Sequence, residues 1–218
     1  MYRQLPNQLT ILRLVLAGVF FVTLNQYRFS RPEVVTESIP HDLWLWLAVS
    51  LFVLAALTDA LDGYLARRWA VESTFGRIMD PFCDKVLIIG AFIYLAGPRF
   101  VMPDRVQAGD FFNMVSGVYP WMVAVILARE LLVTGVRGQF EGQGVSFGAN
   151  VFGKLKMILQ SVAVPVILGI VALNPTRSVL LAILRDLMVY ATIIVTVFSG
   201  LPYLAQASAV MRRAGRDR

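Results

Sequence analysis

Four aspartates, Asp59, Asp62, Asp80 and Asp84, lie within one short stretch beside long apolar runs. Ionisable groups are costly near the membrane interior and usually mark a functional site there. Carboxylate oxygens are the ligands that Mg²⁺ and Mn²⁺ prefer. On helices that advance about 100° per residue, Asp59 and Asp62 share one face, and Asp80 and Asp84 share another. If these two faces meet, their acids can bind cations.

Small residues and one arginine accompany the acids on the same two faces. Gly63, Ala66 and Arg67 fall with the first pair within about 140°, and Gly76 falls with the second pair within about 80°. Small residues leave room for a bulky ligand, and arginine can meet a phosphate group. The alternative is that the acids are solvated caps and loop charges at helix ends. The unbroken pattern D-x2-D-G-x2-A-R-x8-G-x3-D-x3-D disfavours that alternative.

The composition indicates a membrane protein. Of 218 residues, 57% are hydrophobic and only 16% are charged, whereas soluble domains are nearer a quarter charged. The net charge of +6 is assigned to basic loops facing anionic lipid headgroups, not to nucleic acid. We expect an all-α integral membrane fold with a single domain over residues 1–218. Its six transmembrane helices are predicted at about 9–26, 43–62, 82–97, 119–138, 155–173 and 187–207.

The distribution of positive charge predicts the orientation. With six spans both termini share one side, and that side receives fourteen of the twenty Lys and Arg residues. The positive-inside rule therefore places the termini and the acids in the cytoplasm. One boundary stays open: the third helix either begins near Thr74, with Pro81 inside it, or begins at Pro81 with Asp80 as its cap. His41 and the outer segments 27–42 and 98–118 are predicted to be loops.

A second polar cluster is basic. Arg129 and Arg137 lie two turns apart near the end of the fourth predicted span, and Lys154 and Lys156 open the fifth. All four belong to the same side as the acids, so they could bind a phosphomonoester through fork-shaped and point-charge donors. The alternative is a structural pair in which Glu130 neutralises Arg129.

The acid pattern resembles the signature of the CDP-alcohol phosphotransferases, membrane enzymes of phospholipid synthesis. The opening Pro6-Asn7-Gln-Leu9-Thr10-Ile-Leu-Arg13 and the basic cluster are similar to the branch that makes phosphatidylglycerophosphate. The resemblance runs from Pro6 to about Gln160. The segment from Gly135 to Glu141 departs from the more apolar sequence typical of bacterial members, which bears on the choice of acceptor.

This resemblance implies the activity, the cofactors and the roles of the residues. The expected reaction transfers the phosphatidyl group of CDP-diacylglycerol to glycerol 3-phosphate and releases CMP, with Mg²⁺ or Mn²⁺ as cofactor. The family commonly forms homodimers, and the expected location is a bacterial inner membrane. Asp84 is the implied general base. The implied metal ligands are Asp59, Asp62, Asp80 and Asp84; the CDP-binding residues are Asn7, Thr10, Asp62, Gly63, Ala66, Arg67 and Gly76; the acceptor-phosphate residues are Arg129, Arg137, Lys154 and Lys156.

Other functions remain open at this point. Within the family, the acceptor could be an inositol phosphate, or phosphatidylglycerol as in cardiolipin synthase. From a different class, a cation transporter could use acids inside the membrane as an ion path. Because the acids cluster toward one membrane face and not in the middle of a span, the enzyme is favoured over the transporter.

Overall fold

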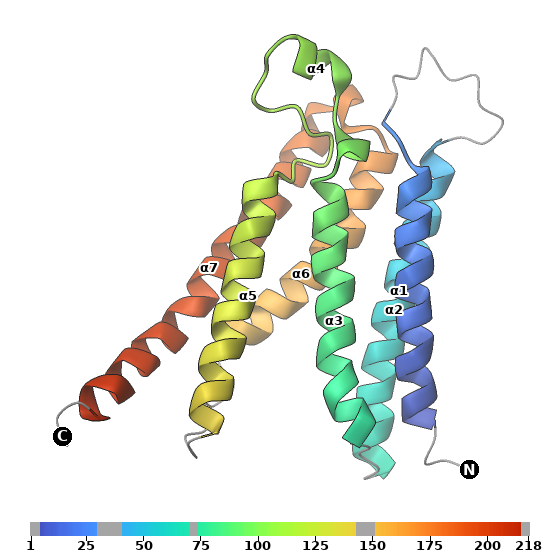
Figure 1. The fold of residues 1–218 in the computed structure, drawn as a ribbon. Coiled ribbons are helices and arrows are strands. Elements are labelled where there is room, and N and C mark those ends of the chain that lie inside the picture. Colours follow the sequence, from blue (N-terminus) through green and yellow to red (C-terminus); the bar gives the residue numbers. More distant parts are fainter. Residues whose placement is uncertain (1–4, 30–40, 70–73, 143–150, 215–218) are drawn as a thin grey trace.

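The protein is a bundle of long helices, seen in a computed structural model (Figure 1). The structure describes residues 5–29, 41–69, 74–142 and 151–214. Within these ranges only the backbone is described for residues 5–7, 41, 62–69, 74–78, 80, 140–141, 177, 206–207 and 209–214. The long helices are α1 (Leu5–Gln26), α2 (His41–Trp69), α3 (Thr74–Leu95), α5 (Pro120–Glu141), α6 (Val151–Ala172) and α7 (Val179–Ala214).

Successive long helices run in opposite directions, so all six bring one end to each side of the bundle (Figure 1). We call the side where α1 begins and α7 ends the acid end, because it carries the aspartate pattern. The opposite side carries α4 (Pro103–Gln107) and the short turns η3 (Pro98–Phe100) and η4 (Pro175–Arg177), and we call it the loop end. Helix α1 packs against α2 and α3, while α7 packs against α5 and α6.

The apolar content of the helices explains the bundle. Buried aromatic and aliphatic side chains from all six long helices and from segment 98–118 form the core, among them Phe20, Phe52 and Phe92. Many other large apolar side chains point outward, including Val22, Leu57 and Ile158. In water such a surface would be unfavourable, whereas in hydrocarbon it carries no cost. The outward surface therefore suits a bilayer.

Four helices in the described part of the chain are long and apolar enough to cross a membrane. These stretches are Gln8–Gln26, Asp42–Leu61, Val151–Ala172 and Val179–Ala205. Helices α3 and α5 do not qualify by the same measure. Both carry charge within their length: α5 contains Arg129, Glu130 and Arg137. The six predicted spans thus correspond to six long helices, of which four are apolar enough to count as spans by themselves.

The structure decides one boundary that the sequence left open and corrects another. The third helix begins at Thr74 and contains Pro81, so the alternative in which it starts at Pro81 is excluded. Asp80 and Asp84 consequently lie one turn apart on one continuous helix. The last helix begins at Val179, eight residues before the predicted start at 187. Its early turns were mistaken for loop because they contain the charged pair Arg185–Asp186.

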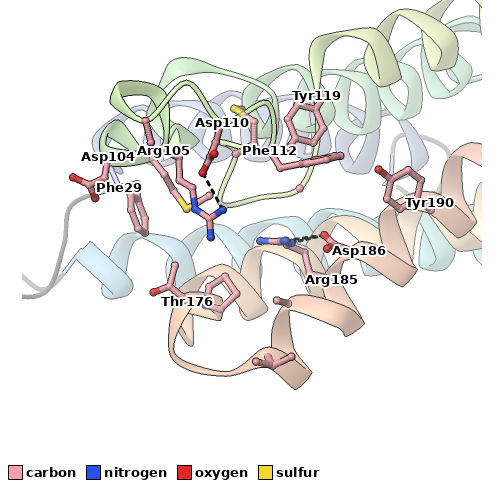
Figure 2. Close-up of a pocket in the computed structure, with 17 residues that line it drawn as sticks. Phe29, Asp104, Arg105, Asp110, Phe112, Tyr119, Thr176, Arg185, Asp186 and Tyr190 are labelled. Carbon is pink, nitrogen blue, oxygen red and sulfur yellow. Dashed lines mark hydrogen bonds and ion pairs between the residues drawn. The ribbon is translucent and has the colours of Figure 1, made fainter.

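The loop end has more structure than its sequence suggested. His41 begins helix α2 and is not a loop residue, and segment 98–118 folds over the start of α7. Figure 2 shows a cavity of about 710 Å³ between this segment and α7, with Arg105 and Arg185 among the side chains that line it. Arg185 donates to the Val115 carbonyl at 2.8 Å and pairs with Asp186 at 2.7 Å. The charge of Arg185 is tolerated within α7 because it is paired with Asp186 and hydrogen-bonded to the Val115 carbonyl. The bond to Val115 also attaches segment 98–118 to α7.

Gly117 sits where this loop meets α7, and we expect Gly117→Ala to destabilise the protein. Its φ of 69° is in the left-handed region, and an added Cβ would lie 2.9 Å from both Arg185 Nε and Asp186 Oδ1. Strain and contact together should lower the free energy of unfolding by about 1–3 kcal/mol. Thermal unfolding in detergent measures this loss.

Gly109 provides the matched control. Its φ of 74° is similar, but a Cβ there meets nothing within 4 Å. Gly109→Ala should therefore show only the backbone strain and a smaller loss of stability. Equal losses in the two variants would mean that the contact with the Arg185–Asp186 pair contributes nothing.

Candidate active site

Helices α1, α2 and α3 meet through charged side chains at the acid end. Nη1 of Arg13 lies 2.8 Å from Asp59 Oδ1 and 3.4 Å from Asp84 Oδ1. Arg13 belongs to α1, Asp59 to α2 and Asp84 to α3. One nitrogen atom thus contacts a carboxylate from each half of the aspartate pattern. The two acidic faces expected from the sequence therefore converge at Asp59 and Asp84.

Burial differs sharply between the partners. The Arg13 side chain is 1% exposed, whereas Asp59 and Asp84 are 44% and 31% exposed. A buried guanidinium requires paired charge, because removing it from water is expensive. The carboxylates keep an open side from which another ligand can approach. Arg13 therefore holds the Asp59 and Asp84 carboxylates from the buried side, while their other side stays accessible to solvent.

The remaining members of the pattern are placed by their backbone only. Asp62, Gly63, Ala66 and Arg67 follow Asp59 on α2, and Gly76 and Asp80 precede Asp84 on α3. Their side chains are outside the described set, so their predicted roles stay predictions. Thr10 is buried one turn before Arg13 on α1. Asn7 lies in the first turn of that helix, and its side chain is also outside the described set.

The acids fit a divalent cation by the chemistry of their oxygens. Asp59 and Asp84 provide the carboxylate oxygens that such cations prefer. Both already contact one cationic group, the Arg13 guanidinium. Among the residues with described side chains, no group of three or more potential metal ligands occurs. A site of the predicted composition would therefore have to draw on Asp62 and Asp80 as well.

A cavity of about 620 Å³ is lined by Asp84 and by the basic cluster. Asp84 lines it from α3, and all four predicted phosphate-binding residues line it from α5 and α6: Arg129, Arg137, Lys154 and Lys156. Lys85, next to Asp84, also faces the cavity and donates to the Thr134 hydroxyl at 3.0 Å. Residues separated by some seventy positions in sequence thus share one chamber, which we call the polar cavity.

The basic wall of the polar cavity is held together by Glu130. Glu130 Oε2 accepts from Arg129 Nη1 at 3.0 Å and from Lys156 Nζ at 2.6 Å. The Arg129, Glu130 and Lys156 side chains are only 10%, 16% and 8% exposed. The Arg129–Glu130 pair, which the sequence offered as the structural alternative, is present, and Lys156 joins it. Because the two cations outnumber the carboxylate, the wall keeps a positive charge that a phosphate could meet.

Sequence reasoning missed three residues of this region. Arg13 was counted only as a positive charge, although an arginine inside an apolar helix is a signal of a buried partner. Lys85 was not assigned a role, and Glu130 was considered only as a neutralising group. The contacts of all three cross from one helix to another, so no local pattern could have indicated them.

Removal of the Arg13 charge should destabilise the helix contacts at the acid end. We expect Arg13→Met to lower the free energy of unfolding by about 1–3 kcal/mol, since two partly buried carboxylates would lose their partner. Thermal unfolding in detergent measures the change. Arg105→Met is the control, because Arg105 and Asp110 form an exposed pair, 56% and 46% exposed, that should contribute at most about 1 kcal/mol. Similar losses in both variants would contradict the special role of Arg13.

Known proteins are similar to most of this chain. The model of the CDP-alcohol phosphatidyltransferase family matches residues 3–198. A Bacillus subtilis protein named CDP-diacylglycerol–glycerol-3-phosphate 3-phosphatidyltransferase is 34% identical over 93% of this chain and 94% of its own length. A Mycobacterium tuberculosis protein named probable phosphatidylglycerophosphate synthase is 34% identical over 93% of this chain and 81% of its own length.

The resemblance drawn from the aspartate pattern is thereby confirmed over nearly the whole chain. The family match includes α1 with Arg13, both halves of the aspartate pattern, and the helices α3, α5 and α6 that line the polar cavity. The apolar helices and this family together make the protein a multi-pass membrane protein. The chain belongs to the CDP-alcohol phosphatidyltransferase family.

Proposed function

We propose that the protein transfers the phosphatidyl group of CDP-diacylglycerol to the primary hydroxyl of glycerol 3-phosphate. The products are phosphatidylglycerophosphate and CMP. One observation carries this proposal: a single cavity is lined both by Asp84 and by the cations Arg129, Arg137, Lys154 and Lys156. A base beside a phosphate-binding wall is what an acceptor with a hydroxyl and a phosphate requires. The names of the relatives from Bacillus subtilis and Mycobacterium tuberculosis agree with this choice.

The acceptor would bind in the polar cavity by its phosphate. Arg129 and Lys156 come from the buried wall, and Arg137 and Lys154 are exposed at the rim. Fork-shaped and point-charge donors together neutralise a phosphomonoester. An acceptor without phosphate, such as choline or ethanolamine, would leave this charge unmet. The basic wall thus supports a phosphorylated alcohol as acceptor.

Asp84 is proposed as the general base. With the acceptor phosphate on the basic wall, its primary hydroxyl can point toward α3, where Asp84 is partly exposed. The carboxylate takes the hydroxyl proton as the oxygen forms a bond to the β-phosphorus of CDP-diacylglycerol, counting from the cytidine. The bond from that phosphorus to the bridging oxygen breaks, and CMP leaves. Correct positioning of both reactants supplies much of the rate enhancement.

Divalent cations are proposed at Asp59, Asp62, Asp80 and Asp84. Bound Mg²⁺ or Mn²⁺, with two ions as the expected number, would offset pyrophosphate charge and stabilise the leaving phosphate. Arg13 would keep Asp59 and Asp84 in place beside it. The CDP group would lie against Asn7, Thr10, Asp62, Gly63, Ala66, Arg67 and Gly76, as the resemblance implies.

The setting of the reaction is also proposed. Fourteen of the twenty Lys and Arg residues fall on the side of the acids, so the acid end would face the cytoplasm, in a bacterial inner membrane. A homodimer remains a prediction from the family. Ion transport is disfavoured, because Asp59 follows the apolar run of α2 and does not interrupt it.

An acceptor panel tests the proposal. Purified protein with Mg²⁺ and CDP-diacylglycerol should release CMP when glycerol 3-phosphate is added, and labelled acceptor should appear in the lipid product. Inositol 1-phosphate, phosphatidylglycerol and unphosphorylated glycerol are the comparison acceptors. If CMP release is faster with inositol 1-phosphate or with phosphatidylglycerol, that compound is the acceptor and glycerol 3-phosphate is not. No CMP release with any acceptor would contradict the reaction.

A further inference from the structure

Glu130 places a negative charge in a cavity that otherwise suits an anion. It lines the polar cavity together with five cations: Lys85, Arg129, Arg137, Lys154 and Lys156. Its side chain is 16% exposed, so its charge is largely removed from water. A carboxylate at this place would weaken phosphate binding by direct repulsion. Its presence therefore needs a reason beyond charge.

Pairing with Arg129 and Lys156 accounts for only one of the two carboxylate oxygens. Both hydrogen bonds end on Oε2, at 3.0 and 2.6 Å. Among the described residues no hydrogen bond reaches Oε1. An ionised carboxylate accepts through both oxygens. Oε1 thus receives no hydrogen bond from the described residues, on a side chain that lines the polar cavity and that Arg129 and Lys156 hold in place.

An open carboxylate oxygen distinguishes among the groups of a bound molecule. It repels phosphate oxygens and attracts hydroxyl groups, because it can only accept a hydrogen bond. The phosphate would therefore take the donors of the neighbouring cations, and a hydroxyl would take Oε1. With the phosphate of a three-carbon acceptor on the basic wall and its reacting hydroxyl at Asp84, the middle carbon lies between them. Its hydroxyl is the group that can reach Oε1.

We propose that Glu130 determines acceptor specificity by accepting, at Oε1, a hydrogen bond from the hydroxyl on the carbon next to the phosphate-bearing carbon. The substrate class is then a phosphomonoester with a neighbouring hydroxyl, and not any phosphorylated alcohol. This inference rests on the proposed function, because it concerns the acceptor of that reaction. Arg129 and Lys156 act in it as the groups that hold the carboxylate.

The test compares two acceptors that differ by one hydroxyl. Glycerol 3-phosphate has the group, and 3-hydroxypropyl phosphate lacks it while keeping the primary hydroxyl and the phosphate. A hydrogen bond to a charged acceptor predicts that the native protein prefers glycerol 3-phosphate by roughly 10- to 100-fold in kcat/KM. Equal kcat/KM values for the two acceptors in the native protein would overturn the inference.

Glu130→Gln should remove most of this preference. Arg129 and Lys156 are both donors, so they hold the amide oxygen in the place of Oε2. The NH₂ group then occupies the place of Oε1 and can only donate to the hydroxyl oxygen, so a hydrogen bond to a charged acceptor becomes a weaker neutral one. We expect the ratio of the two kcat/KM values to fall about tenfold below that of the native protein. The KM for CDP-diacylglycerol should change little.

The outcomes separate this inference from simpler ones. A purely structural role for Glu130 would lower kcat/KM for both acceptors by the same factor, and an unchanged ratio in Glu130→Gln overturns the inference. If Glu130→Gln does not fold, Glu130→Asp takes its place: it keeps the charge but withdraws the oxygens by one methylene, and the same loss of preference is expected. Absence of turnover with either acceptor in the native protein would contradict the proposed function instead.

Discussion

Asp84→Asn should reduce kcat by about 10²- to 10⁴-fold, the range typical of a lost general base. The amide has nearly the shape of the carboxylate and can still accept from Arg13, but it cannot take a proton from the acceptor hydroxyl. CDP-diacylglycerol binding should be largely kept, because the other acids remain. CMP release under saturating substrates measures the rate, and equilibrium binding of labelled CDP-diacylglycerol measures the affinity.

A second aspartate provides the control for this substitution. Asp110 forms an exposed pair with Arg105 at the loop end, and neither residue lines the polar cavity. Asp110→Asn makes the same chemical change without touching the proposed reaction, so CMP release should stay close to that of the native protein. Full activity in Asp84→Asn would exclude Asp84 as the general base. Loss of donor binding parallel to loss of rate would indicate instead that it acts mainly in holding the donor.

Lys156→Met should raise the KM for glycerol 3-phosphate roughly 10- to 100-fold while changing the KM for CDP-diacylglycerol far less. Lys156 is 7% exposed and faces the polar cavity, so its ammonium would meet the acceptor phosphate in a place poor in water. A hydrogen bond between charged groups contributes about 1.5–3 kcal/mol there. Methionine keeps the length and apolar stem of lysine without its charge. Initial rates at varied acceptor and donor concentrations separate the two KM values.

Lys154 allows a comparison within the same helix turn. It also lines the polar cavity, but its side chain is exposed. Water and salt screen an exposed charge, so Lys154→Met should raise the acceptor KM by a smaller factor than Lys156→Met. Equal rises for acceptor and donor in Lys156→Met would contradict a pocket for the acceptor phosphate. A larger rise of the acceptor KM in Lys154→Met than in Lys156→Met would indicate that the phosphate binds at the exposed rim of the cavity.

Much of the fold could be predicted from apolar runs alone. Each of the six predicted spans corresponds to a long helix, because a continuous apolar run in a membrane protein has few alternatives to a helix. The boundaries were less predictable. Charged residues made the start of α7 resemble a loop, since the Val115 carbonyl that receives Arg185 is some seventy residues away. Pro81 left two possible starts for α3, and only packing decided between them.

The candidate site divides in the same way. The pattern of aspartates, glycines and Arg67 resembles the family signature, and the family model confirms that resemblance. Helical geometry adds only which of these residues share a face. The basic cluster was also visible, as charges at the ends of two helices on one side of the membrane. Neither pattern showed which acid would face which cation. That depended on how the helices pack.

The sequence by itself determined a helical membrane protein of the CDP-alcohol phosphatidyltransferase family, with its acids and its cations on one side. It could do so because composition and apolar runs indicate membrane helices, and because the aspartate pattern resembles the family signature. The tertiary structure alone decided that Arg13 joins Asp59 to Asp84, and that Glu130 joins Arg129 to Lys156. The physical reason is that a buried charge is stabilised by whichever opposite charge packing brings within about 3 Å, and that neighbour can lie anywhere along the chain.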